Sequence, residues 1–211
     1  MVSLFSIPRK NLQTGDKLAN RTAHVSFGFI LGMIYIPIDI IVINNNLNFP
    51  YLKNTWPFWI LALMLTILGS EGPDFDQLYN FMSHRDIITH SAFYPGIFFG
   101  IGIWFRLTTN HVLVTVFIPF LIAYASHLFL DYFPNIDTRD LYKGELRIKE
   151  KKGTFLMHMP FLFEDRKGKK RKTLDVKHTE RWLLVNAVLT FAMAMLLSLA
   201  KYYYPLPPLS F

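Results

Sequence analysis

Histidines and aspartates gather in three short motifs of this chain, each beside an apolar stretch. The motifs read GPDFD (Gly72 to Asp76), SHRDIITHS (Ser83 to Ser91) and SHLFLDYF (Ser126 to Phe133), and His24 precedes them. Imidazole and carboxylate groups bind divalent metals, and a bound ion can activate water for hydrolysis. Ionisable groups at membrane depth are costly, so their presence indicates function. The chain has no cysteine, so any metal needs His, Asp, Glu or backbone oxygen as ligands.

The SHLFLDYF motif places His127 and Asp131 four residues apart near the end of an apolar stretch. In a helix this spacing puts both side chains on one face, roughly 6 Å apart along the axis. The pair could bind one metal ion, or Asp131 could orient the imidazole of His127. The alternative without a function is an ion pair at a helix end.

The GPDFD motif follows an apolar stretch that its glycine and proline should end. Asp74 and Asp76 lie two residues apart, and their oxygens could bind or share a metal ion. A carboxylate that does not bind the metal could act as a general base. The alternative is a turn in which an aspartate caps the next helix.

The SHRDIITHS motif carries two imidazoles, His84 and His90, six residues apart. Arg85 could hold an anionic oxygen and stabilise charge that develops on a substrate. Thr89 and Ser91 could orient ligands or cap the next helix. The alternative is a polar loop followed by a capped helix.

Five apolar stretches must position these motifs. The chain has 211 residues, 52% of them hydrophobic, with a mean hydropathy of +0.26. We therefore expect an all-α, polytopic integral membrane protein that forms one membrane domain over residues 1–211. The expected spans are residues 24–43, 56–73, 92–107, 112–133 and 182–201. The polar stretch 134–181 is expected to be a basic cytoplasmic loop or a small subdomain.

The basic residues predict the orientation of these spans. With the N-terminus inside, all of the 22 lysines and arginines except Lys53, Arg106 and Lys201 lie on the cytoplasmic side. We therefore expect a multi-pass protein of the cell's inner membrane, with a cytoplasmic N-terminus and the C-terminus outside. His24 and the three motifs then all lie at the cytoplasmic face.

The net charge of +7 predicts an anionic partner. Because the chain is so apolar, we expect membrane lipids rather than nucleic acid, with anionic headgroups meeting a cluster in the polar stretch. The cluster consists of Arg166, Lys167, Lys169, Lys170, Arg171 and Lys172. A solvated loop is the alternative, and the sequence leaves the oligomeric state open.

In their order, His24 and the three motifs resemble the YdjM-like family of inner-membrane, metal-dependent hydrolases. That family has an early histidine, then PDxD, HRGxTHS and an HxxxD pair on a later helix, and the resemblance covers roughly residues 22 to 135. The family's distant likeness to zinc-dependent phospholipases C implies a phosphoester or lipid substrate. Asp86 stands where the family usually has glycine, and the stretch from His84 to His90 is one residue longer than the family pattern.

The resemblance implies a role for each motif residue. Arg85 and Ser91 would support the site, and Asp86 adds a carboxylate beside it. The metal ligands or ligand orienters would be His24, Asp74, Asp76, His84, His90, His127 and Asp131.

We therefore expect a metal-dependent hydrolase that acts on an ester or phosphoester, with Asp74 or Asp76 as the general base. The mixture of His and Asp favours Zn, with Mn or Mg as alternatives. Two other functions remain open: a transport subunit that handles cations or protons, and a membrane scaffold with a structural metal.

Overall fold

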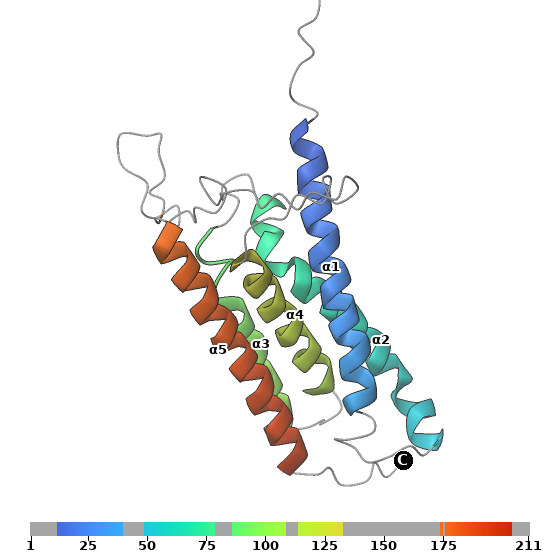
Figure 1. Ribbon diagram of the computed structural model, residues 1–211. Helices are drawn as coiled ribbons and strands as arrows, with labels where there is room; N and C mark the ends of the chain where they lie inside the picture. The colour runs from blue at the N-terminus through green and yellow to red at the C-terminus, as the bar shows by residue number, and fades with distance from the viewer. Residues whose placement is uncertain are drawn as a thin grey trace, which may run out of the picture.

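Helices make up nearly all of the residues that the structure describes. The computed structural model describes residues 12–39, 49–78, 86–108, 114–132, 174 and 176–203. Within them lie five α-helices and one short 3-10 helix (Figure 1). Long apolar runs favour helices in a membrane because a helix satisfies its own backbone hydrogen bonds. The elements are α1 (Leu12–Ile38), α2 (Phe49–Glu71), η3 (Gly72–Leu78), α3 (Phe93–Thr108), α4 (Val114–Tyr132) and α5 (Val176–Tyr203).

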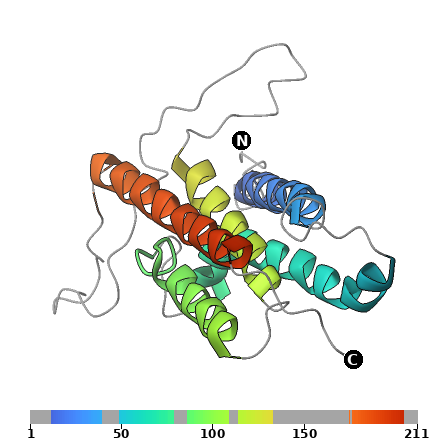
Figure 2. The same ribbon diagram turned by 90° about the horizontal axis from the view of Figure 1, so that it is seen from below.

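Helix α4 lies at the centre of the bundle. It packs against each of the other four α-helices, which surround it in the end-on view (Figure 2). Val114, Ile118, Leu121 and Leu128 on α4 are all fully buried. The prediction of an all-α protein is therefore confirmed for the described residues, and one helix forms most of its core.

Small residues bring α1 and α2 into close contact. Gly28 and Gly32 lie one turn apart on α1, where a Cβ at Gly28 would stand 2.6 Å from the Ser70 Cβ. A Cβ at Gly32 would stand 2.9 Å from Thr66. This is the small-xxx-small pattern by which membrane helices pack closely. The contact holds α1 beside the C-terminal half of α2.

Two more glycines hold the end of α2 and the start of η3 against α4. A Cβ at Gly69 would stand 2.4 Å from the Phe120 carbonyl oxygen, and one at Gly72 would stand 2.8 Å from the Tyr124 ring. Neither position has room for a side chain. The close packing of Gly69 and Gly72 against α4 determines where Asp74, two residues after Gly72, lies relative to α4.

The outward faces of α1, α2 and α5 are apolar. Exposed large side chains include Ile34 on α1, Met64 on α2 and Val188 on α5. A soluble protein rarely exposes so much apolar surface, whereas lipid-facing helices require it. Among the described residues two stretches are long and apolar enough to cross a membrane, Trp56–Phe75 and Lys177–Lys201. Ala23–Ile38 and Val116–Tyr132 are apolar but shorter.

Helices α3 and α4 agree with the expected spans 92–107 and 112–133 within two residues, whereas α1, α2 and α5 begin earlier than the spans expected there. Helix α1 is already helical at Leu12, well before residue 24, and it runs through Ile38. Residues 40–43 of the expected span lie outside the described part of the chain. Helix α5 begins at Val176, so the last residues of the expected loop 134–181 are helical. Hydropathy marks the part of a helix that can lie in lipid, whereas the helix continues through polar residues at its ends. Residues 133–173, with the basic cluster, lie outside the described residues.

A buried ion pair joins α1 and α5 at the end of the bundle where α1 ends. Lys201 Nζ donates to both carboxylate oxygens of Asp39, at 2.5 and 2.7 Å. The Tyr35 hydroxyl donates to the same carboxylate at 3.0 Å. Asp39 is 0% and Lys201 4% exposed. Each charge is therefore compensated inside the protein.

Candidate metal centre

At the opposite end of the bundle, three elements and the turn before α3 bring candidate ligands together. His24 lies midway along α1, Asp74 lies in η3, and His90 lies in the turn before α3. His127 and Asp131 lie in the last turns of α4. All but Asp74 are buried. The structure thus assembles residues from all the motifs, although they lie up to 107 positions apart in the sequence.

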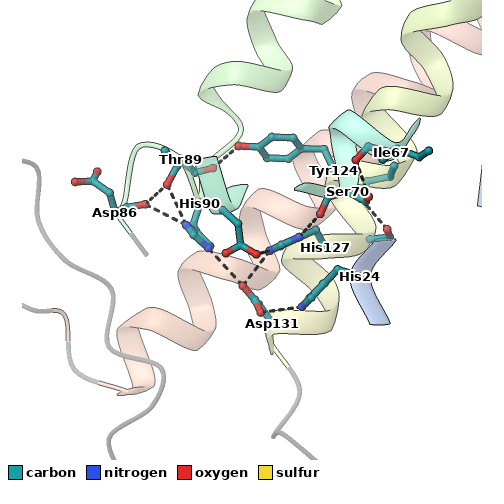
Figure 3. A network of polar contacts seen from close by, with 12 residues as sticks. His24, Ile67, Ser70, Asp86, Thr89, His90, Tyr124, His127 and Asp131 are labelled. Atoms are coloured by element: carbon teal, nitrogen blue, oxygen red, sulfur yellow. Dashed lines mark hydrogen bonds and ion pairs between the residues drawn. The ribbon is translucent and has the colours of Figure 1, made fainter. Parts of the chain in front are cut away.

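Asp131 is the centre of this cluster (Figure 3). Its Oδ2 atom lies 3.4 Å from His127 Nε2 and 3.5 Å from His90 Nε2. Its Oδ1 atom lies 3.5 Å from His24 Nε2. Three imidazoles from three parts of the chain therefore direct the same ring nitrogen toward one carboxylate.

Backbone carbonyls determine which nitrogen of two of these rings carries a proton. His127 Nδ1 lies 2.5 Å from the Ser70 carbonyl oxygen, which can only accept a hydrogen bond. His90 Nδ1 lies 3.3 Å from the Asp86 carbonyl oxygen and 3.1 Å from Thr89 Oγ1. Both rings therefore carry a proton on Nδ1, and in its neutral form each ring presents the Nε2 lone pair to Asp131.

This arrangement is the one that metal-binding histidines adopt. A ligating imidazole usually donates its second N–H to a carbonyl or carboxylate, which holds the ring in place. Without a cation, the Nε2 lone pairs of His90 and His127 would face the negative oxygen of Asp131. Around a tetrahedral zinc ion with bonds of roughly 2.0–2.1 Å, neighbouring ligand atoms lie about 3.3–3.4 Å apart. The distances to Asp131 Oδ2, 3.4 and 3.5 Å, are close to that spacing.

His24 differs from the other two histidines in the orientation of its ring. Its ring stacks on that of His127, with centroids 4.0 Å and planes 22° apart. An ion bound by imidazole lies close to the ring plane, and planes so nearly parallel do not meet within a metal–nitrogen bond of roughly 2.1 Å. His24, His127 and Asp131 form a group that could hold a metal ion, with ligand atoms within 4.8 Å of one another, although the stacked rings of His24 and His127 would have to turn to bind the same ion.

The rings of His90 and His127 can converge on one ion. Their centroids are 6.0 Å apart and their planes meet at 69°. Asp74, His90 and His127 form a second group whose ligand atoms lie within 4.8 Å of one another. Asp74 Oδ2 lies 4.0 Å from His127 Nε2, and its side chain is 24% exposed against 8% for Asp131. Asp74 is thus the more accessible carboxylate of the site.

Three other predicted residues build the turn that carries His90. Asp86 directs its carboxylate away from Asp131 (Figure 3), and Oδ1 accepts the Ile88 N–H at 3.0 Å. Thr89 Oγ1 donates to the Asp86 carbonyl at 3.0 Å. Ser91 Oγ accepts the Phe93 N–H at 3.1 Å, which caps α3. Of the two alternatives for Ser91, the cap is the one that the structure contains.

Other predicted site residues lie outside the described part of the structure. His84 and Arg85 belong to residues 79–85, and of Asp76 only the backbone is described. Their proposed roles therefore remain predictions.

Several residues that hold the ligands were not predicted from the sequence. Ser70 acts through its backbone carbonyl, which leaves no signal in the sequence. The Tyr124 hydroxyl donates to the Thr89 carbonyl. From α5, Trp182 and Asn186 bond to the same turn. Asn186 could have been noticed as a buried polar residue in an apolar stretch.

Comparison with known proteins supports the resemblance read from the motifs. A family model described as YdjM inner membrane protein matches residues 20–203. The chain belongs to this family. The match extends well past residue 135, where the motif resemblance ended, and it includes α5. No curated protein and no solved structure gave a significant match.

Proposed function

We propose that this YdjM family member is a membrane-embedded, metal-dependent hydrolase that acts on an ester or phosphoester. One observation supports it above all: His90 and His127, with their Nδ1 protons held by backbone carbonyls, direct Nε2 toward the same oxygen of Asp131. A simple ion pair needs one imidazole at this carboxylate, whereas three converge on it. The residues fit a divalent metal, and the ion would supply a water molecule of lowered pKa and polarise the substrate.

Each residue of the chain has a distinct part in this proposal. His90, His127 and Asp131 hold the ion. Asp74 is more accessible than Asp131 and would take the proton from the attacking water as a general base. His24 would donate an N–H to Asp131 Oδ1 and so hold that carboxylate in place. Asp76 and Arg85 retain the roles expected from the sequence, as an alternative base and as a stabiliser of substrate charge.

Zn is our first choice of metal. Two imidazoles and a carboxylate are a common ligand set for catalytic zinc, which leaves one position for water or substrate. Mn or Mg would require more oxygen ligands, which Asp74 and Asp76 could supply.

The first test is metal content. We expect mass spectrometry of the detergent-purified protein to find bound Zn or Mn, and a His90→Ala, His127→Ala variant to lose it while remaining folded. His178→Ala is the matched control because His178 is exposed on α5 and belongs to neither group of candidate ligands. A wild-type protein without metal, even after supplementation, would contradict the proposal.

Activity is the second test. The metal-loaded protein would be assayed with nitrophenyl esters, nitrophenyl phosphodiesters and phospholipid in mixed micelles, beside the same double variant. Hydrolysis that the variant lacks would support the proposal. A loaded protein that hydrolyses none of these classes would favour the scaffold with a structural metal.

The transport alternative has less support from the described residues. The candidate metal ligands around Asp131 and the Asp39–Lys201 pair lie at opposite ends of the bundle. Two buried hydroxyls between them, Thr66 and Thr190, donate to carbonyls within their own helices, at 2.7 and 2.8 Å. They form no chain of groups along which protons could move.

The cytoplasmic orientation of the site and the binding of anionic lipid by residues 166–172 remain part of the proposal. The excess of basic residues on the side of the site supports both. Cysteine accessibility labelling at either end of the chain would test the orientation.

A further inference from the structure

Helix α5 supplies no residue to the cluster, yet two of its side chains bond to the turn that carries His90. Trp182 Nε1 donates to the His90 carbonyl at 2.9 Å. The Ala92 N–H donates to Asn186 Oδ1 at 2.8 Å. The two residues are four apart, so they lie on one face of α5. Together they hold the backbone at His90 itself and two residues after it.

The orientation of the Asn186 amide is also determined. Its Nδ2 atom donates to the Trp182 carbonyl at 2.8 Å, so its oxygen must be the atom that faces Ala92. Asn186 is buried, with 7% of its surface exposed. A buried amide whose donor and acceptor are both used resists rotation, because any other orientation would leave a polar group unsatisfied.

The turn itself has little regular structure with which to hold His90. Its hydrogen bonds within residues 86–92 include those from the His90 N–H and Nδ1 to the Asp86 carbonyl, at 3.0 and 3.3 Å. These bonds fix the ring relative to the turn, but they do not fix the turn relative to Asp131 on α4. Trp182 and Asn186 on α5 and Tyr124 on α4 provide that second link.

We propose that Trp182 and Asn186 are positioning residues that hold His90 Nε2 at the distance from Asp131 that metal binding requires. The inference rests on the proposed metal site, and it adds α5 to the parts of the chain that determine metal affinity. Residues that orient a ligand from outside the coordination sphere typically change metal affinity about 10–100-fold when they are replaced.

The test measures Co(II) binding to the full-length protein in detergent. Trp182→Phe keeps an aromatic ring and removes the N–H, whereas Asn186→Leu keeps the approximate volume and removes both hydrogen bonds. We expect each to weaken Co(II) binding about 10–100-fold and to alter the visible absorption of the bound ion. Thr190→Val is the control, since it removes one buried hydrogen bond within α5, from Thr190 Oγ1 to the Asn186 carbonyl.

A purely structural role would give a different result. The variants would then lose thermal stability, as Thr190→Val should, while Co(II) affinity and spectrum stayed those of the wild type, and that result would overturn the inference. If either Trp182→Phe or Asn186→Leu fails to fold, the Co(II) affinity of the other variant still tests the inference. Wild-type protein that binds Co(II) but hydrolyses nothing would contradict the proposed hydrolase alone. Wild-type protein that binds no Co(II) would overturn both.

Discussion

The imidazole of His24 lies flat against that of His127, with ring centroids 4.0 Å apart and planes at 22°. This stacked geometry indicates different roles for His24 and His90, which the sequence could not distinguish. His90 meets His127 at 69° and can share an ion with it, whereas His24 reaches only the other oxygen of Asp131. We therefore expect His24 to act on the carboxylate rather than on the metal.

This difference predicts unequal effects of the two histidines on metal binding. His24→Gln keeps a donor for Asp131 Oδ1, so Zn affinity should fall by about 10-fold or less. His90→Gln removes a ligand and should abolish stoichiometric binding. Isothermal titration of both variants with Zn measures the difference. Loss of the ion from His24→Gln as complete as that from His90→Gln would show that His24 is a ligand.

Replacing the two carboxylates of the site, Asp131 and Asp74, should have different effects. Asp131→Asn removes the negative oxygen on which His90 and His127 converge, so the protein should lose its metal. Asp74→Asn should keep the metal and lose about 10²–10⁴-fold in hydrolysis rate, as expected for removal of a general base. Metal content and turnover measured on the same samples would check this. An Asp74→Asn variant without metal would make Asp74 a ligand.

The contact between α1 and α2 predicts a long-range effect on the site. Gly28→Ala would place a Cβ 2.6 Å from the Ser70 Cβ, and the Ser70 carbonyl holds His127. We expect lower thermal stability and weaker metal binding together. Gly100→Ala is the control, because a Cβ there meets nothing within 4 Å. Alanine in an exposed helix position is favoured over glycine by up to about 1 kcal/mol, so this control should be neutral or stabilising.

The ion pair at the far end predicts an effect on stability alone. Lys201→Met leaves the Asp39 carboxylate buried without its cation and should cost about 3–5 kcal/mol of unfolding free energy. Adding Asp39→Asn should recover most of this loss, since the asparagine oxygen can still accept from Tyr35. Equilibrium unfolding in mixed micelles would measure both variants. A double variant as unstable as the single one would contradict this account.

Much of the site could be predicted because the ligand types cluster at the ends of apolar stretches. Successive helices run in opposite directions, so Asp74, His90 and Asp131 must meet at one end of the bundle. The sequence could not reveal that His24 stacks on His127, because two rings in different helices have no pattern in common. The role of Ser70 was hidden for a related reason: it acts through a backbone carbonyl, which every residue carries.

The central position of α4 has a consequence for how sequences of this fold can diverge. Helices that face lipid tolerate any apolar residue at most outward positions, since the bilayer imposes no shape. Helix α4 packs against the other four α-helices, is buried along most of its length, and carries Tyr124, His127 and Asp131. A library of single substitutions should therefore accept many changes along the outer faces of α1, α2 and α5, and few on α4 apart from the exposed Phe129.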